Sequence, residues 1–283
     1  MAGDGLTFLQ FADRLGLNLF ALLTIGFALH AAFGVMERDA FGRLRWLATA
    51  SAVIALIFVA MRFLILLAQM GDGSQLIDPE LAPLAWSALG NSSLLIAGGL
   101  VVAAGAIWLK SRWLALLGAI AAGGGFALTG HTQGLIDPGL APVAVAAHVL
   151  LAGFWIAAPV SLYPFAHVED ARLIRRLERF SAIAVAAIPV LVVLGIWLSF
   201  ALTRNLEGLL GSAYGQLLLG KLAVGVAGMA VGAVNKQVLT GKLKTSPETC
   251  RRWLRITLVT EAALFASAIA FVSAATTFTG PPE

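Results

Sequence analysis

Eight apolar stretches, each long enough to cross a lipid bilayer, constrain this chain more than any other feature of its sequence. A transmembrane helix needs about 20 consecutive, largely apolar residues. The approximate limits of the stretches are 6–35, 44–70, 81–109, 113–131, 139–163, 180–202, 217–239 and 256–278. They lack the polar–apolar alternation of the strands in a membrane β-barrel. We therefore predict an all-α integral membrane protein, a bundle of eight transmembrane helices.

The low content of charge indicates that lipid is the solvent for most of the chain. Charged residues make up 12% of the 283 positions, compared with about 25% in an average soluble domain. A net charge of +4 is too small to indicate a nucleic-acid partner, and a single cysteine, Cys250, excludes a disulfide scaffold. Because the gaps between stretches are short, we expect residues 1–283 to form one polytopic membrane domain. Residues 1–5 hold no basic residue, so the first stretch is expected to remain a membrane helix rather than be cleaved as a signal peptide.

The basic residues predict which way the bundle faces. Lysine and arginine concentrate in the cytoplasmic loops of membrane proteins. Segments 38–45, 110–112, 172–179 and 236–255, which all fall on one side, hold 15 of the 19 basic residues. The opposite loops hold Arg204 and several acidic residues. Both termini are therefore predicted on the outer side, which is periplasmic in a Gram-negative host.

An eight-residue motif occurs twice in the loops assigned to the outer side. Residues 76–83 read LIDPELAP, and residues 135–142 read LIDPGLAP. Aspartate is a favoured N-cap, and proline suits the first turn of a helix. We predict that each copy begins a helix.

Polar groups inside the apolar stretches are the candidates for function, because placing such a group in lipid is costly. The candidates are His30, Arg62, Asn91, His131, His148, Lys221 and Glu261. Imidazole is a common ligand of copper, zinc and haem iron. His148 is expected to lie about 10 Å deeper than His131, judged from the helical rise. The two histidines are then successive stations for one ion, or ligands of one site if helix tilt and unwinding close the gap, or groups that form hydrogen bonds between helices.

The remaining candidates have structural as well as functional interpretations. His30 lies in the inner half of the first stretch and is either a third station or a hydrogen-bonding partner of a neighbouring helix. Arg62, Lys221 and Glu261 are expected to form charge pairs within the bundle or to serve as a relay. The chain has no phosphate-binding loop, metalloprotease helix or nucleophile elbow, so no catalytic residue is predicted.

Short pieces in the second half of the chain carry a resemblance to one known family. They are, in chain order, Gly130-His131, His148 with Phe154-Trp155, Arg179-Phe180-Ser181, Tyr214 to Leu222, Asn235-Lys236, and Arg251 to Glu261. In this order and spacing they resemble the copper resistance protein D (CopD) family of bacterial inner-membrane proteins. The chain departs from the family pattern at Trp155–Pro159 and at Gly90–Ser92.

The resemblance implies that the protein transports or transfers copper from periplasmic copper-binding proteins towards the cytoplasm, as a transporter rather than an enzyme. It places the metal-binding histidines at His131 and His148, and the embedded charges at Lys221 and Glu261. Contact with membrane lipid is expected, and nucleic acid is not. One alternative is a redox membrane protein that holds haem b between two histidines from His30, His131 and His148, which requires facing helices and matched depth. Another is a structural or assembly subunit, with which neither metal nor haem would copurify.

Overall fold

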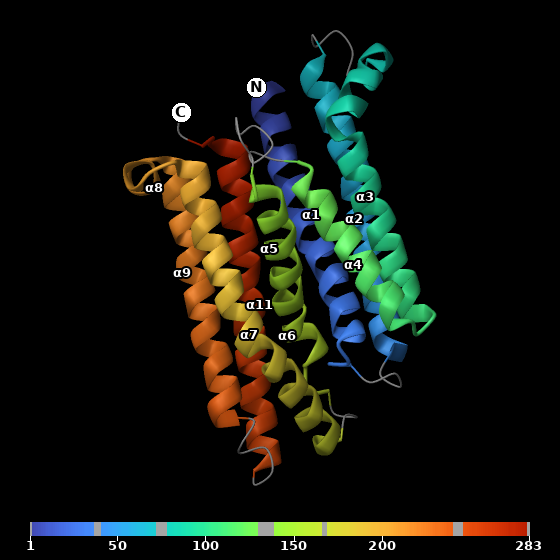
Figure 1. Ribbon diagram of the computed structural model, residues 1–283, viewed down its shortest axis with the longest axis vertical. Helices are drawn as coiled ribbons and strands as arrows, with labels where there is room; N and C mark the ends of the chain where they lie inside the picture. Colours follow the sequence, from blue (N-terminus) through green and yellow to red (C-terminus); the bar gives the residue numbers. More distant parts are fainter. Residues whose placement is uncertain are drawn as a thin grey trace.

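The computed structural model describes residues 2–36, 41–71, 78–129, 139–165, 169–239 and 246–281, and within these ranges every regular element is helical (Figure 1). The α-helices are α1 (Ala2–Ala32), α2 (Phe41–Met70), α3 (Ala82–Trp108), α4 (Arg112–Ala127), α5 (Ala141–Ile156), α6 (Ala158–Ser161), α7 (Asp170–Thr203), α8 (Leu206–Gly211), α9 (Ala213–Val234) and α11 (Pro247–Phe278). A 3₁₀ turn, Pro79–Leu81, precedes α3, and a π-helical segment, Asn235–Leu239, continues α9.

Seven helices of the described residues are long and apolar enough to cross a membrane, which confirms a multi-pass membrane protein. They are α1, α2, α3, α5 together with α6, α7, α9 and α11. The fourth predicted stretch forms α4, which has 16 residues and is shorter than a full span. Of its expected last turn, Leu128 and Thr129 lie outside the helix, and Gly130 and His131 lie beyond the described residues. The predicted count of eight spans is therefore supported for seven of them.

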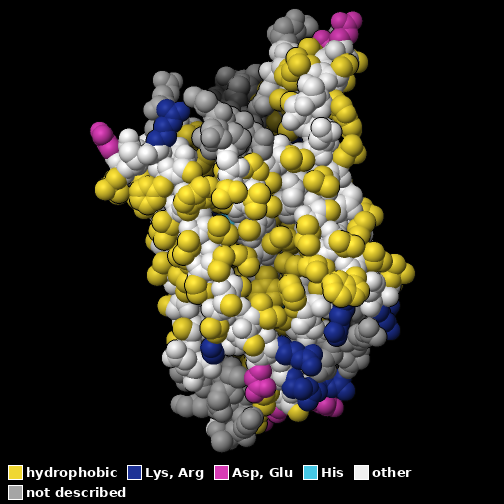
Figure 2. Space-filling view, viewed as in Figure 1, with side chains coloured by type: hydrophobic (Ala, Val, Ile, Leu, Met, Phe, Trp, Pro, Cys, Tyr) yellow, Lys and Arg dark blue, Asp and Glu magenta, His cyan; other side chains and the backbone are white. Residues whose placement is uncertain are grey.

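The charges sort to the two ends of the bundle, as the sequence predicts. Both chain termini lie at one end, which we call the terminal end (Figure 1). Figure 2 shows a broad apolar belt across the middle of the face in view, with most of the visible lysine and arginine at the opposite end, which we call the basic end. α7 and α11 begin about ten residues before their predicted membrane limits, and these extensions carry several of the basic residues.

Small residues allow the central helices to approach closely. α1 packs against α2, α4, α5 and α11, and Ala21, Ile25 and Ala28 on it are fully buried. At the crossing of α3 and α4, a Cβ added to Gly99 or Gly118 would collide with the backbone of the facing helix. In a lipid environment such close backbone contact replaces the hydrophobic driving force between helices.

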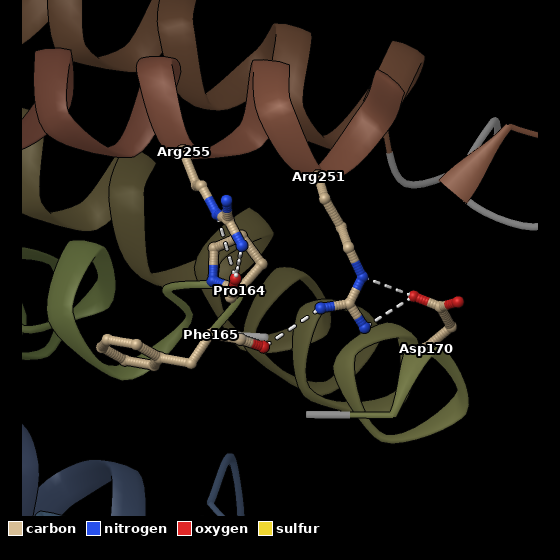
Figure 3. Close-up of polar contacts among 5 residues, drawn as sticks. All are labelled: Pro164, Phe165, Asp170, Arg251 and Arg255. Atoms are coloured by element: carbon tan, nitrogen blue, oxygen red, sulfur yellow. Dashed lines mark hydrogen bonds and ion pairs between the residues drawn. The ribbon is translucent and has the colours of Figure 1, made fainter. Parts of the chain in front are cut away.

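The basic end is held together by two arginines of α11 (Figure 3). Arg251 donates to Asp170 Oδ1 from Nε and Nη2, both at 2.7 Å, and from Nη1 to the Phe165 carbonyl oxygen at 3.1 Å. Arg255 donates from Nε and Nη2 to the Pro164 carbonyl oxygen at 3.1 and 2.9 Å. These contacts fix the connection between α6 and α7, and with it the position of α7 beside α5.

The first copy of the repeated motif begins a helix, as predicted. Asp78 Oδ1 accepts a hydrogen bond from the backbone N–H of Glu80 at 2.9 Å, and Pro79 occupies the first helical position. In the second copy the corresponding Asp137 and Pro138 lie outside the described residues.

Candidate functional site

His148 and Lys221 lie together between α5, α7 and α9. The Lys221 ammonium lies 3.5 Å from His148 Nε2, at the outer limit of a hydrogen bond. The other ring nitrogen, Nδ1, is buried against α7 on the side of the Leu191 carbonyl. Because an ammonium can only donate, Nε2 must be the unprotonated nitrogen in this arrangement. Its lone pair, which would bind a metal ion, therefore faces a cationic side chain.

Gly195 of α7 makes room for the imidazole ring. A Cβ at this position would lie 3.2 Å from His148 Cε1, which is tighter than ordinary side-chain contacts. The glycine thus lets the α7 backbone approach the ring directly, and it sets the orientation of His148 towards Lys221.

Two adjoining cavities meet at this pair. An apolar cavity of about 250 Å³ extends from it towards the basic end. Its wall includes Trp155, Leu222, Val226, Met229 and Phe265. A second cavity of about 300 Å³ extends towards the terminal end; we call it the polar cavity because more polar side chains line it than line the first. Both cavities include His148 and Lys221 in their walls.

The polar cavity gathers basic side chains from helices that are distant in the sequence. Arg14 of α1, Arg62 of α2 and Lys221 of α9 all line it. Arg14 Nη1 donates to the Thr276 carbonyl oxygen and to Thr277 Oγ1 of α11. The neighbouring Asp13 is 1% exposed, and its Oδ1 atom makes no hydrogen bond within the described parts of the chain.

Sequence reasoning identified Arg62 and Lys221 individually but did not place them in one cavity, and it passed over Asp13 and Arg14. Both missed residues lie seven to nine positions inside the first apolar stretch. Two adjacent charges at that depth are the signal that could have identified them, since a charge inside a membrane segment demands a partner or a function.

His30 is engaged at both ring nitrogens. It is fully buried, with Nε2 lying 2.8 Å from the Phe154 carbonyl oxygen and Nδ1 2.8 Å from Ser161 Oγ. Since a carbonyl only accepts, Nε2 carries the proton and Nδ1 accepts from the Ser161 hydroxyl. The ring also packs edge-on against Phe154 and Phe180. Binding a metal here would require breaking one of these hydrogen bonds, so the geometry favours the hydrogen-bonding interpretation of His30.

Glu261 lies nearer the basic end, away from the cavities. Its side chain is 3% exposed, and Oε1 accepts a hydrogen bond from Asn235 Nδ2 at 3.3 Å. Asn235 Oδ1 in turn accepts from the Thr257 hydroxyl at 2.5 Å. Asn235 begins the π-helical segment, a distortion that is frequent at functional positions. Glu261 and Lys221 therefore occupy different levels of the bundle and do not form a pair.

The histidine predicted nearest the outer surface, His131, lies outside the described residues. Across the ranges that are described, no group of three or more histidine, cysteine, aspartate or glutamate side chains is placed to hold a metal ion. The haem alternative gains no support there either, because His30 is already engaged and His148 meets Lys221. A further donor that sequence reasoning missed is Met229, whose thioether group lines the apolar cavity with His148.

A helical bundle with an apolar belt and intramembrane polar cavities defines a multi-pass membrane protein. Residues 174–275 of the chain match the family model described as Copper resistance protein D, which supports the resemblance to the CopD family over this part of the chain. The match runs from α7 into α11, so it includes Gly195, Lys221 and Glu261 but neither His131 nor His148. Comparison with curated proteins and with solved structures finds no match.

Proposed function

We propose that this protein handles copper in a bacterial inner membrane and moves copper ions from the periplasm towards the cytoplasm, in copper uptake or resistance. The observation that carries the proposal is the CopD match across α7, α9 and α11, because these helices form much of the wall around His148. In this orientation the terminal end is periplasmic and the basic end cytoplasmic, as the distribution of lysine and arginine predicts.

The donor atoms around the apolar cavity suit copper in transit. His148 offers an imidazole nitrogen and Met229 a thioether sulfur, and both donor types bind copper. Lys221, which lies beside His148, is eight residues from Met229 on α9, about 12 Å along the helix. His148 and Met229 therefore act in succession. Because the Lys221 ammonium faces His148 Nε2, a copper ion can bind there only when Lys221 moves aside. This competition between Lys221 and copper for His148 favours transport of the ion over its storage.

The route towards the cytoplasm continues past an aromatic barrier. Trp155 and Phe265 pack edge-on at 4.9 Å and close the apolar cavity together with Leu191. Beyond them lies the carboxylate of Glu261, the next group able to accept a cation. We propose His131, His148, Met229 and Glu261 as successive stations.

Delivery at the periplasmic face requires a donor, for which we propose a soluble periplasmic copper-binding protein. Glu80 and Glu207 are exposed at the terminal end, and acidic residues on a surface raise the local concentration of cations.

Metal analysis of the purified protein tests the proposal. We expect copper in the wild-type protein, less copper in His131→Ala and His148→Ala, and wild-type copper in the matched control His167→Ala, whose histidine is predicted to lie in a cytoplasmic loop. Equal copper stoichiometry in all four proteins would exclude both histidines as ligands. A visible spectrum of protein produced with haem available distinguishes copper handling from the haem alternative, because a Soret band would indicate bound haem.

A further inference from the structure

The polar cavity carries an excess of positive charge. Arg14, Arg62 and Lys221 line it, and Asp13 beside Arg14 is the one carboxylate among its described neighbours that opposes them. The same Asp13 carboxylate also faces Arg62, so one negative charge stands against three cations. Cationic groups inside a membrane protein normally face an anion or a water-filled space. The cavity therefore has the chemistry of an anion site.

The apolar cavity next to it opens towards lipid. Leu222 and Val226 of α9 line this cavity and are 37% and 51% exposed on the surface of the protein. They lie within the apolar belt, so the mouth of the cavity faces the acyl chains of the bilayer. The two cavities share the wall around Asn18, His148 and Lys221, and together they are polar at one end and apolar at the other.

We propose that the joined cavities bind one anionic membrane lipid, which enters between α7 and α9. Its phosphate lies among Arg14, Arg62 and Lys221, and part of an acyl chain fills the apolar cavity as far as Met229. The amphipathic shape favours a lipid over a free anion, because inorganic phosphate would fill the polar cavity and leave the apolar one empty. This inference does not depend on copper handling, since it rests on charge and shape alone.

Lipid retention by the intact protein is the test. The protein is reconstituted with equal amounts of phosphatidylglycerol and phosphatidylcholine, extracted in mild detergent, and analysed by native mass spectrometry. We expect one phosphatidylglycerol retained by the wild type. Each phosphate-facing cation contributes about fivefold in affinity, so Arg14→Gln/Arg62→Gln should weaken retention roughly 25-fold. The charge-conserving Arg14→Lys/Arg62→Lys should keep the lipid, and so should Arg204→Gln, which removes an exposed arginine at the same end.

A second variant tests the acyl-chain site without touching a charge. Gly225 lines the apolar cavity, and a Cβ added there meets no atom within 4 Å, so Gly225→Leu fills the cavity without a clash at the backbone. We expect it to lose the lipid, whereas the matched Gly98→Leu, at an equally open position on α3, keeps it. This arm remains informative if the double arginine variant does not fold.

Three results would overturn the proposal. If Gly225→Leu retains phosphatidylglycerol, no acyl chain fills the apolar cavity. If inorganic phosphate readily displaces phosphatidylglycerol from the wild type, the ligand is a free anion. Equal retention of phosphatidylcholine and phosphatidylglycerol by the wild type would show that the three cations do not select a negative headgroup.

Discussion

Replacing His30 with alanine should destabilise the bundle while leaving its copper content unchanged. The substitution removes two hydrogen bonds, each 2.8 Å long, to Ser161 and to the Phe154 carbonyl. Such bonds in a membrane protein contribute about 0.6–1.5 kcal/mol each. The space left by a fully buried ring adds about 1–2 kcal/mol. We expect a total loss of about 3 kcal/mol, which lowers Tm by roughly 5 °C for a chain of 283 residues.

Thermal unfolding in detergent measures the loss, and Ser161→Ala is the matched control. That variant removes one of the two bonds and should cost about 1 kcal/mol. The stability lost in the double variant should be smaller than the sum of the two single losses, since both changes remove the same contact. A His30→Ala protein that melts like the wild type but binds less copper would refute this reasoning and make His30 a ligand.

Three further variants probe the site and the frame around it. Gly195→Leu should abolish copper binding at His148 while the protein remains folded, because even a Cβ there lies 3.2 Å from the imidazole; metal analysis checks this. Glu261→Gln should retain copper at His148 but slow copper flux through proteoliposomes, since it keeps a partner for Asn235 and removes the charge. Arg251→Gln should lower the free energy of unfolding by about 1 kcal/mol in thermal melts, as it breaks a partly exposed ion pair to Asp170.

The helices and their order could be predicted from hydropathy, because each span must satisfy its own backbone within lipid. The rotation of each helix about its axis could not. A lipid-facing residue such as Val226 and a core residue such as Ile25 are equally apolar, so the sequence pattern does not distinguish them. This is why the sequence identified Lys221 and His148 individually but did not predict that they are neighbours.

Two local features also escaped prediction for physical reasons. The partner of His30 depends on α5 ending at Ile156 and on the short α6, which brings Ser161 back to the ring, and hydropathy does not encode such a break. α4 ends at Ala127, after a run of glycines, and so ends before the apolar stretch that contains it. The sorting of charge to the two ends was predictable, since it depends on composition along the chain rather than on packing.

Copper flux into sealed proteoliposomes tests the central claim most directly. The wild-type protein should carry copper across the membrane, and His148→Ala should reduce this flux to the level of protein-free vesicles while His167→Ala matches the wild type. Equal flux through the wild type and His148→Ala, or no flux above protein-free vesicles for the wild type, would contradict the account.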